Sequence, residues 1–187
     1  KGNISSDNEE IRTYTNVFFQ STVIPVDRLR IHVGVNVNKT NYDYTDRYLT
    51  DEDQSGNYGF DWMVSPRIAA SFRAWTGIYF YANASHGFSP PGLQETLTPE
   101  GVVNPDIQPE TGWNFEVGTR GSLINDRLFY DVNIYSMPVE NLLVARRTAE
   151  DQFVGVNAGK TSHQGMEFAL QNMLVQKESW TLQLFVN

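Results

Sequence analysis

Apolar and polar residues alternate with a period of two along most of the chain. From Leu29 to Asn38 every odd position holds Leu, Ile or Val, and every even position holds a polar residue or glycine. This period predicts β-strands, because helical spacing does not fit these segments. The expected strands are Arg12–Val23, Leu29–Tyr42, Phe60–Phe72, Ile78–Phe88, Gly112–Leu123, Leu128–Arg146, Phe153–Leu174 and a final strand from Trp180.

Two kinds of connection join these strands. Long polar stretches occupy 43–59 and 89–110, and a shorter connection lies at 148–152. The other connections are short turns, predicted at Pro25–Arg28, Arg73–Gly77, Ile124–Arg127 and Val175–Ser179, with centres near Asp27, Trp75, Asp126 and Lys177. Short turns at one end and longer loops at the other are typical of outer-membrane β-barrels. Glycine and proline inside strands favour bulges, and we expect these at Pro138, Gly159 and Gly165.

Each predicted strand has an apolar face and a polar face. One face is expected to carry Val33, Val35, Val117, Val132, Ile134 and Phe168. The other is expected to carry Asn36, Glu116, Asp131 and Glu167. A wet lumen on one side and lipid on the other would accommodate both faces. The predicted fold class is therefore all-β: an antiparallel meander of about eight long strands, part of a larger transmembrane β-barrel.

Composition narrows the possible partners. The chain has 187 residues and a formal net charge of −8, which argues against a nucleic-acid partner because such a partner calls for a basic patch. It contains no cysteine, and so neither a disulfide framework nor a thiolate zinc site. No signal-peptide pattern begins the sequence, and its last residues, Trp180–Asn187, stop inside an alternating strand. We therefore expect residues 1–187 to be one piece of a longer protein.

Three blocks of sequence resemble TonB-dependent outer-membrane receptors. They are Tyr81-Ala-Asn-Ala-Ser-His-Gly-Phe-Ser-Pro-Pro91, the run from Asn104-Pro-Asp-Ile-Gln-Pro-Glu110 to Gly121, and Arg127–Tyr135 with Asn141-Leu-Leu143 and Asn157–Phe168. The resemblance implies a Gram-negative outer-membrane barrel of about 22 strands with an N-terminal plug. This chain would then hold part of the barrel, with the plug and the remaining strands absent.

The nearest subtype is similar to the siderophore and ferric-citrate receptors. The resemblance implies import of a ferric chelate or similar small ligand, a barrel surrounded by outer-membrane lipid, and contact with TonB only through the absent plug. It implies no cofactor and no enzymatic activity. Glu116 and Glu167 have no supporting acid–base pattern, and no Ser-His-Asp or Cys-His arrangement is evident.

Arg146 and Arg147 are the candidate ligand-binding residues. They lie at the loop end of a predicted strand, and guanidinium groups suit the carboxylates or phosphate-like groups of an anionic chelate. The competing interpretation is that they mark the aqueous rim. Arg67 and Arg120, on the polar face, are expected to pair with carboxylates of the plug or barrel.

Metal binding has weaker support in the sequence. The stretch Asp51-Glu-Asp-Gln-Ser-Gly56 offers clustered oxygens but lacks the spacing of a calcium loop, so a solvated loop is expected. His32, His86 and His163 lack the spacing of metal ligands and are interpreted as ordinary histidines on the polar face.

Two other classes of protein stay open at this point. A soluble β-sandwich or lectin-like binding module would use the same alternation, with its second face in solvent. A passive porin would share the barrel and lack energised transport. The three sequence blocks favour the receptor.

Overall fold

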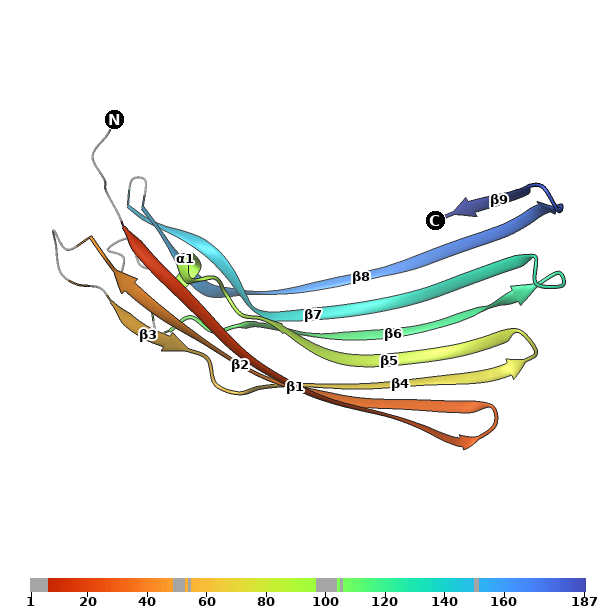
Figure 1. The fold of residues 1–187 in the computed structure, drawn as a ribbon, viewed down its shortest axis with the longest axis horizontal. Coiled ribbons are helices and arrows are strands. Elements are labelled where there is room, and N and C mark those ends of the chain that lie inside the picture. The colour runs from red at the N-terminus through yellow and green to blue at the C-terminus, as the bar shows by residue number, and fades with distance from the viewer. Residues whose placement is uncertain (1–6, 49–52, 54, 97–103, 105, 150–151) are drawn as a thin grey trace.

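The nine strands of the described part of the chain belong to one curved antiparallel sheet (Figure 1). The computed structural model describes residues 7–48, 53, 55–96, 104, 106–149 and 152–187. The strands are β1 (Asn8–Val26), β2 (Leu29–Asp46), β3 (Gly56–Gly59), β4 (Met63–Trp75), β5 (Ile78–Ser89), β6 (Glu110–Leu123), β7 (Leu128–Ala149), β8 (Gln152–Gln176) and β9 (Thr181–Val186). A single helical turn, α1 (Leu93–Thr96), lies between β5 and β6.

The strand order confirms the predicted meander. It runs β1-β2-β4-β5-β6-β7-β8-β9, with the short β3 paired to β2 at one side. Every pairing is antiparallel, so the short turns gather at one end of the sheet, here called the turn end (Figure 1). The opposite end, called the loop end, carries the longer connections, β3 and α1. A β-sandwich needs two sheets packed face to face. The described residues form a single sheet, so the β-sandwich alternative is wrong for them.

Strand ends and turns differ from the prediction in detail. β1 continues to Val26 with a register shift between Val23 and Val26, so Pro25 lies in an irregular part of the strand. β4 continues to Trp75, and the expected five-residue turn is in fact the two-residue turn Thr76–Gly77. Gly77 has a φ of 77°, a conformation that favours glycine. The turn at 124–127 is as predicted, with positive φ at Ile124, Asn125 and Asp126.

Only one of the three expected bulges is found. The β7–β8 register shifts between Leu142 and Leu143, opposite Gly159 and Asn157, which confirms a bulge beside Gly159. Gly165 pairs in register with Tyr135, so a bulge there is wrong. A Cβ on Gly165 would meet the Tyr135 ring at 2.7–2.9 Å, so this glycine makes room for an aromatic ring.

Pro138 also pairs in register, with Ser162 of β8, so a bulge at Pro138 is wrong as well. The β6 ladder instead has no pairs opposite Met137 and Pro138, although its register is the same on either side. Proline has no N–H to donate, and the sheet accommodates it by omitting those pairs.

The register confirms the two predicted faces. Val117 pairs with Ile134, and Ile134 pairs with Met166, so these side chains share one face, here called the outer face. Glu116 pairs with Tyr135, and Asn133 with Glu167, on the opposite, inner face. The outer face is unusually exposed for apolar residues: Ile68 is 53% exposed, Ile134 56% and Met166 71%. Such a surface is a partner-binding or membrane surface and not a protein core.

Most buried residues of the described part lie at the loop end, and Asn133 of β7 is buried farther along the sheet. Tyr42, Tyr44, Phe60 and Ile107 are buried there with Thr40, Thr96 and Asn38. No helix in the described part of the chain is long and apolar enough to cross a membrane.

Candidate functional site

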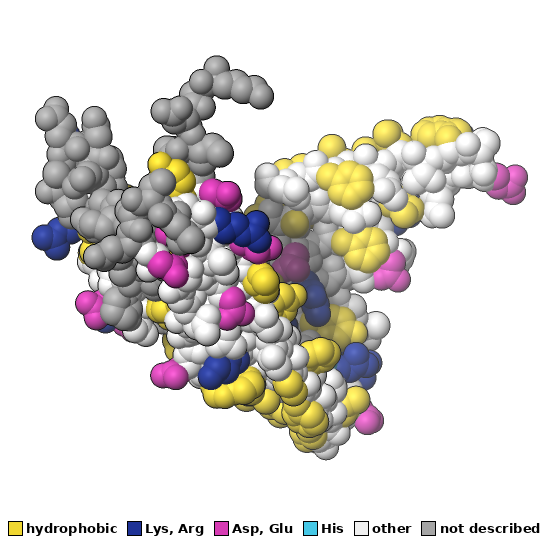
Figure 2. Space-filling view, turned by 60° about the vertical axis from the view of Figure 1, so that its left-hand side comes forward, with side chains coloured by type: hydrophobic (Ala, Val, Ile, Leu, Met, Phe, Trp, Pro, Cys, Tyr) yellow, Lys and Arg dark blue, Asp and Glu magenta, His cyan; other side chains and the backbone are white. Residues whose placement is uncertain are grey.

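A hollow on the inner face is the candidate site. It has a volume of about 840 Å³ and is lined by residues of β1, β2, β4, β5 and β6, among them Asn16, Gln20, His32, Ser65, Arg67, Glu116 and Arg120. Figure 2 shows charged side chains of both signs within the recess and hydrophobic side chains along the lower edge of the molecule. The lining thus contains the polar side chains that the sequence predicted for the lumen side, together with apolar residues such as Phe18 and Phe19.

Arg67 and Arg120 of the inner face have no ion-pair partner within the described part of the chain, where the ion pairs are Arg47–Glu9 and Lys160–Glu140. Arg120 instead lies over the Tyr81 ring, with its guanidinium carbon 5.4 Å from the ring centroid. Barrel carboxylates therefore do not pair with Arg67 or Arg120 among these residues. Pairing with a plug carboxylate stays a prediction.

Several buried polar oxygens on the inner face have no hydrogen-bond partner among the described residues. Asn133 is 9% exposed and donates a 3.1 Å hydrogen bond to Glu167, but its own Oδ1 has no hydrogen bond. The buried side-chain oxygens of Asn36, Ser65 and Asn83 likewise accept no hydrogen bond. Buried polar atoms are normally satisfied by protein or by ordered water, so this surface suits contact with water or a polar partner.

At the loop end, the described parts of the connection between β5 and β6 lie over the inner face. We call residues 91–96, 104 and 106–109 of this connection the inner loop. Its two halves meet where Asn104 N donates to Thr96 O at 2.7 Å. On one side, Tyr42 of β2 donates to Pro91 O at 2.7 Å and Tyr58 of β3 donates to Ile107 O at 2.8 Å. The inner loop is thus attached to the β2–β3 pair by two tyrosine hydroxyls.

On the other side, the inner loop is attached to β8 through Asn157. Asn157 Oδ1 accepts a 2.7 Å hydrogen bond from Gln108 N, and its Nδ2 donates to Gln108 O at 2.8 Å. The same Nδ2 donates to Asn141 O at 2.7 Å, within the β7–β8 bulge. Glu110 at the start of β6 accepts from Leu143 N at 2.8 Å. A Cβ on Gly155 would lie 2.3 Å from the Glu95 carbonyl oxygen, so the loop packs directly on β8.

Aromatic rings enclose the β2–β3 attachment. Tyr42 is 1% exposed, and its ring centroid lies 6.3 Å from that of Tyr58 and 6.2 Å from that of Phe60. Burial raises the pKa of both the Tyr42 and Tyr58 hydroxyls, and the Arg12 guanidinium only partly opposes this for Tyr42. Both hydroxyls are therefore neutral donors at physiological pH.

The predicted pair Arg146 and Arg147 lies near the loop end of β7, where both residues are exposed. They pair with Val154 and Phe153 of β8 and, as neighbours in a strand, project from opposite faces. Gly155 pairs with Ala145, and a side chain at Gly155 would point toward the inner loop. Arg147 lies two residues beyond Ala145 and therefore shares the face of the inner loop, whereas Arg146 lies on the opposite face. The two guanidinium groups therefore do not form a two-residue clamp.

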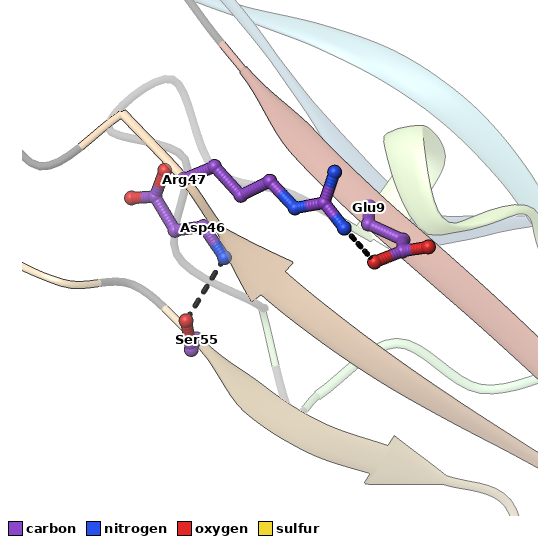
Figure 3. Close-up of polar contacts among 4 residues, drawn as sticks. All are labelled: Glu9, Asp46, Arg47 and Ser55. Carbon is purple, nitrogen blue, oxygen red and sulfur yellow. Dashed lines mark hydrogen bonds and ion pairs between the residues drawn. The ribbon is translucent and has the colours of Figure 1, made fainter.

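At the loop end, one polar contact joins β1 to the end of β2, and another joins the end of β2 to the start of β3 (Figure 3). Arg47 forms an ion pair with Glu9, and Asp46 N donates to Ser55 Oγ at 2.9 Å. The short strand β3 was expected to be loop, because its sequence Gly-Asn-Tyr-Gly has no alternation. It forms because Gly56–Gly59 pairs with Asn41–Tyr44.

The candidate metal ligands do not gather into a site. Within the described residues, no group of three or more His, Asp or Glu side chains could hold a metal ion. Asp51, Glu52 and Gln54 of the possible calcium stretch lie outside the described residues. Asp53 accepts a hydrogen bond from Ser55 N at 2.9 Å, and its hydrogen bonds to Ser55 lower its pKa.

The three histidines are far apart in the sheet. His32 contacts Thr22 at 2.9 Å on the inner face, and His163 lies on β8, opposite Met137. His86 pairs with Trp113 on the outer face, with ring centroids 5.3 Å apart, so its assignment to the polar face is wrong. An imidazole beside an indole suits the interfacial belt, where amphipathic rings gather.

The whole chain matches a family model of known proteins. The family model described as "TonB dependent receptor-like, beta-barrel" matches residues 1–187.

Solved structures share the fold of the chain. The siderophore receptor PiuA from Acinetobacter baumannii matches with a TM-score of 0.73 and 16% identity, over 96% of this chain and 26% of that one. The copper transporter OprC matches with a TM-score of 0.72 and 16% identity, over 89% of this chain and 26% of that one. The Serratia marcescens hemophore receptor HasR was solved with its hemophore HasA and heme. It matches with a TM-score of 0.70 and 18% identity, over 86% of this chain and 32% of that one. The chain thus spans about a quarter to a third of these structures.

Proposed function

Because this chain belongs to the TonB-dependent receptor β-barrel family of the Gram-negative outer membrane, we propose that its parent protein imports a ferric chelate, either a siderophore complex or ferric citrate. The chain supplies part of the barrel wall. Its outer face contacts lipid, and its inner face lines the route of the ligand. Energy comes from TonB through a plug domain outside this chain, and catalysis forms no part of the proposal.

The observation that carries the proposal is the two-faced wall, whose inner hollow contains charged side chains. Exposed apolar side chains such as Ile134 and Met166 face outward, and Arg67, Glu116 and Arg120 line the hollow. A small charged ligand needs a wet, polar route of this kind. The names of fold relatives support iron in particular: besides PiuA, they include the ferric-catecholate import receptor Fiu. Copper and heme are named among the relatives too, so the test must separate these cargoes.

Arg147 is the best candidate in this chain for first contact with an anionic ligand. It is exposed near the loop end and shares the face on which the inner loop lies. Against a net charge of −8, a local cation would raise the rate at which a negative chelate is captured. Arg146, on the opposite face, would contribute only through its long-range field.

An uptake assay in the complete parent receptor tests the proposal. Radioactive ferric citrate, a ferric catecholate, a copper complex and heme are each supplied to cells with and without a functional TonB. We expect uptake of one ferric chelate that requires both the receptor and TonB. Uptake that is equal without TonB would mean a passive pore. TonB-dependent uptake of copper or heme alone would keep the transporter and reject the ferric cargo.

A further inference from the structure

Three separated pieces of sequence meet at the side chain of Asn157. The segment 106–110 supplies Gln108 and Glu110, the β7 bulge supplies Asn141 and Leu143, and β8 supplies Asn157 itself. Asn141 has a φ of 57°, a left-handed conformation that asparagine tolerates better than most residues. That conformation brings its carbonyl oxygen to Asn157 Nδ2.

We propose that Asn157 is a positioning residue that fastens the inner loop across the barrel, making this loop a fixed wall of the outer mouth. One amide satisfies both backbone groups of Gln108, as a neighbouring strand would, and also caps the Asn141 carbonyl. An amide can do this because it carries one acceptor and two donors. The inference extends the proposed function, but its experiment measures loop position and is independent of the cargo.

The fastening is strong because the loop is held at both sides. Tyr42 and Tyr58 hold it at β2 and β3, and Asn157 holds it at β8. Glu110, which follows the loop at the start of β6, is bonded to Leu143 of β7. The Gly155–Glu95 contact leaves no space for the loop to settle deeper. A loop anchored at two walls differs from a free exterior loop that closes only when ligand arrives.

Spin labels on the complete receptor in outer-membrane vesicles measure the loop position. The labels are placed by Asp106→Cys on the loop and Ser162→Cys on the outer face of β8, both exposed positions. We expect a narrow distance distribution in the otherwise wild-type receptor without any ligand. Asn157→Ala should broaden it at least about twofold. Asn172→Ala removes an amide from the same strand away from the loop and should leave the distribution narrow.

Hydrogen exchange gives a second readout. Amide exchange at Gln108 should accelerate about tenfold in Asn157→Ala, because the hydrogen bond to that amide is lost. Glu110→Ala should accelerate exchange at Leu143, while Glu110→Gln keeps an acceptor and should change it much less. If the Asn157→Ala receptor does not assemble, the comparison of Glu110→Ala with Glu110→Gln still tests whether side-chain hydrogen bonds hold this end of the loop. A broad distribution in the wild type, or unchanged distances and exchange in the variants, would overturn the proposal.

Discussion

The hydroxyl of Tyr81 on β5 donates a 2.8 Å hydrogen bond to Asp131 Oδ1 on β7, across the whole width of β6. The ring reaches over Gly118 of β6, where a Cβ would lie 2.6 Å from the ring and 2.7 Å from the Val132 carbonyl oxygen. Arg120 lies against the same ring. The absence of a side chain at one position thus lets two strands that are not neighbours share a polar contact.

Gly118→Ala is therefore expected to destabilise the barrel by about 1–3 kcal/mol, because the added methyl group forces the Tyr81 ring or the backbone to move. Gly87→Ala is the matched control, since a Cβ there meets nothing within 4 Å. Denaturant unfolding of the complete receptor in bilayers measures both. Equal midpoints for the two variants would contradict the close packing of Tyr81 on Gly118.

The two faces should respond differently to charge. Met166→Arg places a cation on the outer face and should cost about 2–4 kcal/mol near the bilayer midplane. Ala169→Arg, three residues along β8 on the inner face and in register with Asp131, should cost much less. A refolding titration into lipid vesicles gives both free energies. Similar costs would mean that the outer face does not meet lipid.

Tyr42→Phe removes the hydrogen bond to Pro91 O while keeping the buried ring. The carbonyl of Pro91 is then left without that donor in a buried position, which should cost about 1–3 kcal/mol. Hydrogen exchange in residues 91–96 should rise, with less change at Gln108, which is held by Asn157. Exchange that is unchanged in both places would mean that Tyr42 does not anchor the loop.

The hydrogen bond from Tyr42 to Pro91 O should be lost at high pH, when the Tyr42 hydroxyl is deprotonated. Burial raises the pKa of Tyr42 above its ordinary value of 10.0. Its stabilising contribution is therefore complete below about pH 10, and it is lost as the pH rises through the folded-state pKa. Stability measured across this alkaline range should fall less steeply in Tyr42→Phe than in the wild type. Parallel curves would show that the Tyr42 hydroxyl is not responsible.

Arg147→Ala should weaken capture of an anionic ferric chelate more than Arg146→Ala, because only Arg147 lies on the face of the inner loop. We expect a loss of about threefold or more in association rate at low salt and a smaller loss at physiological salt. Stopped-flow binding to the complete receptor measures the rate. A change under about twofold for both variants would assign the two arginines to the aqueous rim.

The sequence could predict the strands and their faces because alternation directly encodes which side chains share a surface. Val33, Glu116 and Phe168 lie on the expected faces, and the turn at 124–127 is in the expected place. His86 was misplaced because its polarity suggested the lumen, although its even position sets it beside Ala84 on the outer face. Position in the alternation decides the face more reliably than the chemistry of a single residue.

The inner loop was missed for a different reason. Its hydrogen bonds from Tyr42 to Pro91, from Tyr58 to Ile107 and from Gln108 to Asn157 join residues 49 positions apart, and no local period reports such contacts. The resemblance had drawn attention to both the Asn104–Glu110 and the Asn157–Phe168 blocks. Only the structure shows that they meet.

Strand β8 is 25 residues long, and at a rise of about 3.3 Å per residue it is roughly 80 Å long. With a tilt of about 40°, roughly 60 Å of that length lies along the membrane normal, against an apolar band of about 25 Å. The bilayer is about 40–45 Å thick with its headgroups, so the mouth of the barrel would stand above it by roughly two Debye lengths, each about 8 Å at physiological ionic strength. An arriving ion would sense the charges of the protein there and hardly those of the lipid headgroups.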